Sequence, residues 1–166
     1  MNVRLTTNHG EILLELNPEK APLTVENFIG YVKSGHYDGT IFHRVIDDFM
    51  IQGGGLDQEM NEKPTGDSIR CEADNGLSNL DRTIAMARTA DPHSASAQFY
   101  INTTENAFLD FRSATEDGWG YCVFGKVVEG SDVVESIEEV DTTSRNGYQD
   151  VPVELVIIEK AEVVES

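Results

Sequence analysis

The segment 42–55, which reads FHRVIDDFMIQGGG, constrains the fold more than any other part of the chain. Two short apolar runs flank Asp47 and Asp48, and aspartates in this position favour a tight turn. Two β-type runs joined by a short polar turn indicate a β-hairpin. The hairpin would present the guanidinium of Arg44, the amide of Gln52 and a large apolar surface. Together these groups are suited to binding a peptide, because they combine backbone hydrogen-bond partners with a pocket for a side chain.

The rest of the chain favours one β-rich domain spanning residues 1–166. A length of 166 residues suits a single domain with one core. The hydrophobic fraction of 39% is sufficient for that core and disfavours disorder. Five prolines and 14 glycines divide the chain into many short segments, a pattern more typical of a β domain than of a helical bundle.

Alternating or continuous apolar runs predict about eight strands. They lie at residues 3–6, 11–16, 40–45, 49–52, 83–87, 98–102, 121–128 and 153–162. Between them, residues 53–78, 113–120 and 141–150 are rich in polar residues and glycine and are expected to be loops.

Two segments have helical periodicity. The first opens at Ala21-Pro22 and should end at Gly35 in a left-handed cap, and the apolar positions between them recur at i, i+3, i+4 and i+7. The second follows Ser131, the expected N-cap, with an apolar stripe at positions 133, 134, 137 and 140. Eight strands and two helices predict a closed antiparallel β-barrel capped by the helices, because closure leaves no exposed sheet edge.

The charge of the chain excludes several classes of partner. A net charge of -18, from 30 acidic and 12 basic residues, should repel nucleic acid and anionic membranes. Two interpretations of the acidic excess remain: a well-solvated surface, or adaptation to high salt. A rise in stability and activity from low to molar salt would support the second interpretation.

The cysteines and the apolar runs favour a cytoplasmic protein. Cys71 and Cys122 have neither zinc-site nor disulfide-framework spacing. Cys122, in an apolar strand, should be inert, whereas Cys71, in a loop, should be accessible. No apolar run is long enough for a signal peptide or a membrane span. The lack of heptads favours a monomer.

The hairpin segment resembles the signature of the cyclophilins, a family of peptidyl-prolyl cis-trans isomerases. The pattern Phe-His-Arg-Val-Ile, two turn residues, then Phe-Met-Ile-Gln-Gly-Gly is matched without a gap over residues 42–54. The resemblance implies an eight-stranded barrel with two capping helices and no cofactor or metal. It also implies binding to proline-containing polypeptides. The segment 118–124, GWGYCVF, makes the resemblance strongest to the bacterial cytoplasmic branch.

The resemblance also implies a set of site residues. Arg44 corresponds to the catalytic arginine of the family. The substrate-binding positions are Phe49, Met50, Gln52, Ala87, Arg88, Gln98, Tyr100, Phe108, Leu109 and Tyr121. Among these, Phe49 and Met50 would line the proline pocket, and the two glutamines would bind substrate backbone.

Several positions depart from the eukaryotic pattern. Arg88 and Thr89 replace an Asn-Ala pair, and a cation at the rim should favour acidic residues beside the proline. Tyr100 replaces a pocket phenylalanine, and Tyr121 replaces a pocket histidine. Phe108 stands where eukaryotic members often have a tryptophan that supports cyclosporin binding, so cyclosporin affinity should be weak.

Other interpretations compete with the isomerase. Arg44 could form a surface ion pair with Asp47 or Asp48, and Phe49 and Met50 could be plain core residues. The triple glycine lacks the Lys-Ser/Thr of a phosphate-binding loop. The four histidines have no ligand spacing, and His43 should point away from Arg44, as a structural residue rather than a base. The main alternative is a proline-peptide binding module or holdase with little turnover.

Overall fold

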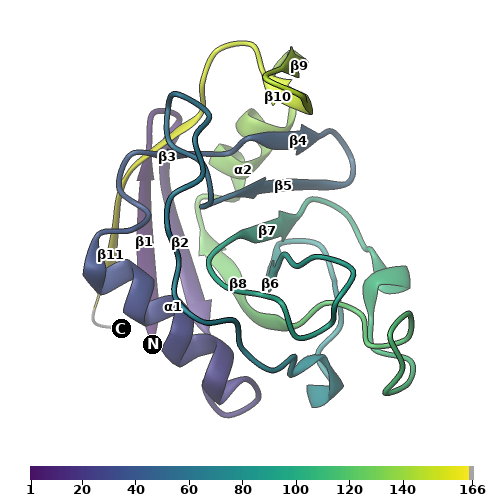
Figure 1. Ribbon diagram of the computed structural model, residues 1–166. Helices are drawn as coiled ribbons and strands as arrows, with labels where there is room; N and C mark the ends of the chain where they lie inside the picture. Colours follow the sequence, from purple (N-terminus) through teal and green to yellow (C-terminus); the bar gives the residue numbers. More distant parts are fainter. Residues whose placement is uncertain (165–166) are drawn as a thin grey trace.

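The computed structural model describes residues 1–164 and is dominated by a nine-stranded antiparallel sheet (Figure 1). The strand order is β3-β11-β1-β2-β8-β6-β7-β5-β4. The strands are β1 Asn2–Thr7, β2 Gly10–Leu16, β3 Thr40–Ile41, β4 Arg44–Ile46, β5 Met50–Gly53, β6 Thr83–Met86, β7 Phe99–Asn102, β8 Val123–Glu129 and β11 Ile157–Val164. The helices are α1 Pro22–Ser34 and α2 Ser131–Glu138, with 3-10 turns η1 Ala73–Asn75 and η2 Ala107–Leu109.

The two edge strands of the sheet, β3 and β4, are adjacent in the chain, so the sheet must curl to bring its edges together. β3 and β4 end the strand order, and only residues 42 and 43 separate them. At this junction Gly53 lies against β3, where a Cβ would approach the Ile41 carbonyl oxygen to 2.7 Å. The expected mainly β fold with two helices is confirmed. The sheet has nine strands rather than eight, and full closure was slightly overstated, because the hydrogen-bonded order ends at β3 and β4.

The first helix forms where its capping residues predict. Pro22 occupies the first turn, and Gly35 ends the helix with a φ of 79° in the left-handed region. The apolar positions Val25, Phe28 and Val32 are buried. The helix lies beside β11 (Figure 1) and contributes this apolar face to the core.

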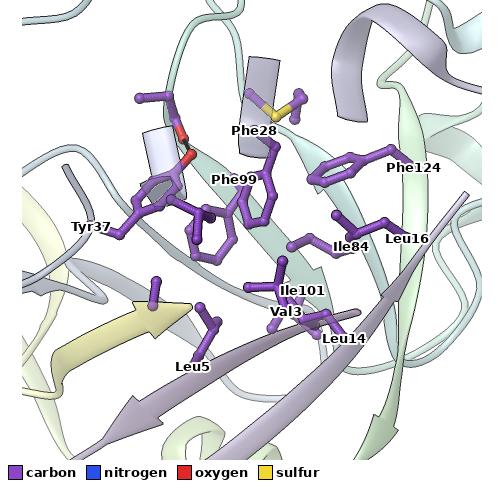
Figure 2. Packing of buried hydrophobic residues seen from close by; sticks show 14 of the residues in the cluster. Val3, Leu5, Leu14, Leu16, Phe28, Tyr37, Ile84, Phe99, Ile101 and Phe124 are labelled. Carbon is purple, nitrogen blue, oxygen red and sulfur yellow. Dashed lines mark hydrogen bonds between the residues drawn. The ribbon is translucent and has the colours of Figure 1, made fainter. Parts of the chain in front are cut away.

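Aromatic rings fill the centre of the core (Figure 2). The ring centroid of Phe28 lies 5.7 Å from that of Phe99 on β7 and 5.1 Å from that of Phe124 on β8. Tyr37 is fully buried and donates its hydroxyl hydrogen bond to the Ala97 carbonyl at 2.7 Å. The core therefore joins α1 to β7 and β8 and leaves the buried phenol of Tyr37 paired.

The second helix begins differently from its prediction. Gly130, with a φ of 90°, is the N-cap, and Ser131 is the first helical residue without a capping bond. The Ser131 hydroxyl instead accepts a hydrogen bond from Arg82 Nε at 2.8 Å. Glycine is needed at the cap because a side chain there would collide with the backbone of β2. The apolar stripe is confirmed in its centre, where Val134 and Ile137 are fully buried.

A second hairpin occupies the segment predicted as a loop. Strands β9 Thr142–Arg145 and β10 Tyr148–Pro152 pair antiparallel around Asn146-Gly147, and both turn residues have positive φ. Asn-Gly is a strong signal for a two-residue hairpin turn. The prediction of a loop was wrong because the flanking residues are polar. The final strand consequently starts at Ile157 rather than at residue 153.

Both cysteines are free and buried. The expected accessibility of Cys71 was wrong, since its residue is 6% exposed. Burial raises the pKa of the Cys71 thiol and raises that of Cys122 to about 12, so both thiols are poor nucleophiles at neutral pH.

Neither helix within residues 1–164 has the length and apolar character needed to cross a bilayer.

Candidate peptide-binding groove

Three neighbouring strands place the predicted polar residues on the outer face of the sheet. Arg44 on β4 pairs with Gln52 on β5, and Gln52 pairs with Tyr100 on β7. Because successive side chains alternate between faces, their neighbours Val45 and Ile51 point into the core, where both are buried. The same pairing that builds the barrel therefore aligns an arginine, an amide and a phenol on its outside.

A cavity of about 230 Å³, lined by both apolar and polar side chains, opens beside this row. Met50 and Tyr100 are almost completely buried there. The cavity is lined by Arg44, Phe49, Met50, Gln52, Ala87, Arg88, Tyr100, Leu109 and Tyr121. The structure thus brings most of the predicted site residues together around one pocket. Phe49 and Met50 also belong to an apolar cluster, so the core interpretation of these residues holds for one side of each and the pocket interpretation for the other.

A chain of side-chain hydrogen bonds borders the pocket. Arg44 Nη1 donates to Gln52 Oε1 at 3.3 Å, and Gln52 Nε2 donates to Gln98 Oε1 at 3.0 Å. Gly55 leaves room for this arrangement, because a Cβ there would overlap the Gln98 side chain. Arg44 forms no ion pair within the described part of the chain, in contrast to the surface-pair alternative.

Gln98 and Phe108 lie at the margins of the pocket. Gln98 lines an adjoining cavity of about 180 Å³, which shares Gln52, Ala87 and Arg88 with the first. Phe108, on η2, is 69% exposed and stacks on Phe49 with ring centroids 6.0 Å apart. The two adjoining cavities share three lining residues and together are called the groove below.

Arg88 is held by its own chain. Its Nε and Nη2 donate to the Gly120 carbonyl at 3.0 and 2.8 Å, and its Nη1 donates to the Thr89 carbonyl at 2.8 Å. Its guanidinium carbon lies 4.4 Å from the centroid of the Tyr121 ring, a cation–π arrangement. Arg88 therefore fixes one wall of the pocket.

A buried polar network supports the pocket from behind, and the sequence analysis missed it. Tyr100 donates its hydroxyl hydrogen bond to Asn79 Oδ1 at 2.7 Å, and Asn102 Nδ2 donates to the same oxygen at 3.1 Å. The backbone N–H of Asn79 donates to Asp110 Oδ1 at 2.7 Å. Burial raises the pKa of Tyr100 well above its usual value, so the phenol remains a donor. Isolated polar residues such as Asn79, Asn102 and Asp110 gave no local signal for this network.

His43 is excluded from the groove. It is 5% exposed, and its ring centroid lies 5.8 Å from that of Tyr148. Its Nδ1 atom is buried and has no hydrogen-bond partner within residues 1–164. Burial, and then the charge of Arg44, lower the pKa of His43 to about 4, so the ring is neutral at physiological pH. These surroundings fit a structural residue.

Two further features limit the chemistry of the site. Trp119 packs on His93 and Phe111, with ring centroids 5.0 and 5.1 Å away, and does not line the pocket. Within residues 1–164, no three His, Cys, Asp or Glu side chains gather closely enough to hold a metal ion. The groove offers a guanidinium, two amides and a cavity with apolar side chains in its wall, and these groups can bind and polarise a peptide.

Comparisons with known proteins agree with this geometry. The family model described as cyclophilin type peptidyl-prolyl cis-trans isomerase/CLD matches residues 2–163. Peptidyl-prolyl cis-trans isomerase cyp18 of Streptomyces antibioticus is 61% identical, over 98% of this chain and 98% of its own. Peptidyl-prolyl cis-trans isomerase B of Escherichia coli K12 is 53% identical, over 98% of this chain and 99% of its own.

A solved structure shares the fold over the full chain. It is a cyclophilin type peptidyl-prolyl cis-trans isomerase of Cryptosporidium parvum, in the presence of the dipeptide Ala-Pro. It has a TM-score of 0.81 and 26% identity, and the match covers 100% of both chains. By its sequence, its rolled sheet and the groove on the outer face of that sheet, the chain belongs to the cyclophilin-type peptidyl-prolyl cis-trans isomerase family.

Proposed function

We propose that this protein accelerates cis-trans rotation of X-Pro peptide bonds in folding chains and exposed loops, with Arg44 as its catalytic residue. The observation that carries the proposal is that Arg44 lines the cavity, is bonded to Gln52 and has no carboxylate partner among residues 1–164. The names of the relatives support the same reaction.

The reaction requires rotation only, and no bond breaks. Resonance in the peptide bond gives a rotational barrier of about 18–20 kcal/mol. In the twisted state the nitrogen becomes pyramidal and regains its lone pair, which can then accept a hydrogen bond. A guanidinium placed at that nitrogen stabilises the twisted state more than the planar one, and this difference accelerates rotation.

Arg44 is suited to this task because guanidinium is always charged and presents several donors in a rigid plane. One charge-assisted hydrogen bond contributes about 1.5–3 kcal/mol, which corresponds to about ten- to a hundredfold in rate. The remaining acceleration would come from the apolar pocket, which holds the proline ring out of water, and from anchoring the chain on one side of it.

The other groove residues have separate parts in the proposal. Phe49, Met50, Tyr100, Leu109 and Tyr121 surround the proline ring. Gln52 and Gln98 offer amide groups to the substrate backbone, and the backbone at Ala87 lies beside them in the adjoining cavity. Phe108, exposed over Phe49, extends the apolar surface beyond the pocket.

The test compares rotation with binding. Cis-trans exchange of a short Ala-Pro-Phe peptide is measured by NMR with wild type, with Arg44→Ala and with Arg4→Ala. Arg4 is a matched control, since it lies on β1 and pairs with Glu11 at 3.8 Å. We expect Arg44→Ala to lower kcat/KM at least tenfold while peptide affinity is largely kept. Binding without acceleration by wild type would instead identify a proline-peptide binding module or holdase.

Three finer proposals accompany this function. Weak cyclosporin binding is expected because phenylalanine, rather than tryptophan, occupies position 108, and calorimetry with Phe108→Trp would show tighter binding.

A monomer is expected from the lack of heptads in the sequence, and measuring the mass of the protein in solution checks this. A cytoplasmic location fits two free, buried thiols, because disulfides are rare in reducing compartments.

A further inference from the structure

Helix α2 meets the turn of the hairpin that carries Arg44. Figure 1 shows α2 beside β4 and β5, and the helix contacts both strands. The turn is closed by a hydrogen bond from Phe49 N–H to the Ile46 carbonyl at 3.1 Å. Asp48 within it has a φ of 58°, a left-handed conformation that side-chain-bearing residues rarely adopt. A contact from outside the hairpin can stabilise a turn of this kind further.

Glu138, the last residue of α2, provides such a contact. Its Oε1 accepts a hydrogen bond from the Asp48 backbone N–H at 3.2 Å. Its Oε2 lies 3.8 Å from Nη1 of Arg82, and the side chain is only 11% exposed. Arg82 is itself held by Ser131 and by Asp81 at 2.9 Å. Glu138 therefore connects the hairpin turn to the turn before β6.

A second carboxyl group lies beside Glu138. The Asp47 side chain is within hydrogen-bonding reach of the Glu138 carboxyl, and the two can share one proton. Burial, followed by the neighbouring Asp47 carboxyl, raises the pKa of Glu138 to about 7, although the Asp48 amide and Arg82 act in the opposite direction. The charge on Glu138 therefore changes close to neutral pH.

We propose that Glu138 is a positioning residue for the isomerase reaction, holding the β4–β5 turn so that Arg44 and Met50 keep their places at the pocket. The register supports this path, since Met50 pairs with Ile46 at the turn and Arg44 pairs with Gln52 two residues further along. The inference rests on the proposed function, because it concerns the same groove.

The other charged groups around α2 do not take part in this contact. Glu135 and Glu139 on the helix itself are exposed. On β2, the other strand that α2 contacts, Glu11 and Glu15 lie near Arg4 and Lys126. His9, before β2, bonds Ser136 through Nδ1 at 3.0 Å. Asp47 and Arg82 are thus the charged side chains that face Glu138.

The direction of the pH effect follows from the carboxyl pair. Below pH 7 a shared proton joins Asp47 to Glu138, so the turn is held at both aspartates. Above pH 7 both carboxylates are charged and repel one another, and only the Asp48 amide bond remains. A looser turn displaces Met50 and Arg44, so peptide binding weakens as pH rises.

The experiment measures kcat and KM from pH 5.5 to 8.5 with a blocked Ala-Ala-Pro-Phe peptide, which has no group that titrates in this range. We expect KM of wild type to rise about threefold across pH 7 with little change in kcat. Glu138→Gln keeps both hydrogen bonds without the charge, so its KM should stay at the low-pH wild-type value across the whole pH range. Glu138→Ala should give a high, flat KM, and Glu135→Gln should keep the wild-type profile.

The amide signal of Asp48 gives an independent readout. It should titrate with a midpoint near 7 in wild type and in Glu135→Gln, and should not titrate in Glu138→Gln. If all three variants kept the wild-type KM profile while remaining folded, the inference would be overturned and the proposed function would stand. If wild type did not accelerate exchange at any pH, the proposed function would fail and the inference with it.

Discussion

Strands β5, β6, β7 and β8 have an inner and an outer face, and alternating side chains make both faces apolar but with different roles. Inward residues such as Ile51, Phe99 and Phe124 are completely buried in the barrel core. Their outward neighbours, among them Met50 and Tyr100, form a second apolar cluster that remains open at the groove. The inner face is covered by packing, whereas the outer face is left free for a ligand.

The difference lies in how each face is held rigid. The inner face needs only dense packing, because close-packed rings have few alternative positions. The open face lacks atoms on one side, so hydrogen bonds behind it must fix the side chains that line it. Asn79, Asn102 and Asp110 do this for Tyr100, and Gln52 does it for Arg44. Stability is therefore expected to depend on the inner face and activity on the outer.

The largest expected effect on stability comes from replacing one phenylalanine on each face with alanine. Phe99→Ala would remove a ring that contacts Phe28, Tyr37 and Phe42, and should lower the free energy of unfolding by about 3–5 kcal/mol. Phe108→Ala, at a residue 69% exposed, should lower it by less than about 0.5 kcal/mol. Urea unfolding measures both. Equal losses would break the comparison.

His43, unlike its exposed neighbour Arg44, is buried, and this burial should make the stability of the protein depend on pH. Because the pKa of His43 is lowered to about 4 when folded, the unfolded chain binds its proton first, and stability falls as pH drops below 6.5. Replacing His43 with Phe keeps an aromatic ring beside Tyr148 without a titrating group. Between pH 6.5 and 5.0, wild type should lose about 2 kcal/mol more than the variant. Urea unfolding at the two pH values checks this, and parallel curves would contradict it.

The hydroxyl groups of Tyr100 and Tyr121 on the outer face should contribute differently to stability, because, of the two, only that of Tyr100 bonds the buried network in the described part of the chain. Tyr100→Phe removes the bond to Asn79 and should cost about 1 kcal/mol of unfolding free energy, with the ring still in the pocket. Tyr121→Phe is the control, since its ring is held by Arg88 from above. Its stability should change by less than about 0.5 kcal/mol. Thermal unfolding distinguishes the two, and a larger loss at Tyr121 would show that the network is not the support.

The smallest expected effect concerns Arg88 at the rim of the groove. Its donors already bond Gly120 and Thr89, so its attraction for an acidic residue beside proline should be worth only about 0.2–1 kcal/mol. Arg88→Asn should therefore lower the preference for Glu- over Lys-flanked peptides by about two- to fivefold. Competition between the two peptides in one exchange experiment measures the ratio. An unchanged ratio would assign Arg88 to the pocket wall alone.

The groove residues could be named because residues 42–54 resemble the cyclophilin signature; without that resemblance Phe49 and Met50 would be interpreted as core. Period-two alternation and a tight turn place Arg44, Met50 and Gln52 on one face of a hairpin, whatever the rest of the chain does. Helix α1 was equally predictable, since Pro22 and Gly35 mark its ends locally. The hairpin at Asn146-Gly147 was missed even though its turn signal is local, because its polar strands did not resemble strands.

Other contacts depended on the curling of the whole sheet. Asn79 meets Asp110 across 31 residues, Gln52 meets Gln98 across 46, and Glu138 meets Asp48 across 90. The sequence predicted Ser131 as an N-cap, but in the structure its hydroxyl accepts a hydrogen bond from Arg82 instead.

The sequence by itself determined which residues face outward on each strand, because side-chain alternation and capping act within a few residues. Only the tertiary structure decided which outward groups meet, which amide holds Arg44, and which carboxylate accepts the Asp48 N–H at the hairpin turn. Those contacts join segments far apart in the chain, and the curl of the whole sheet sets their distances.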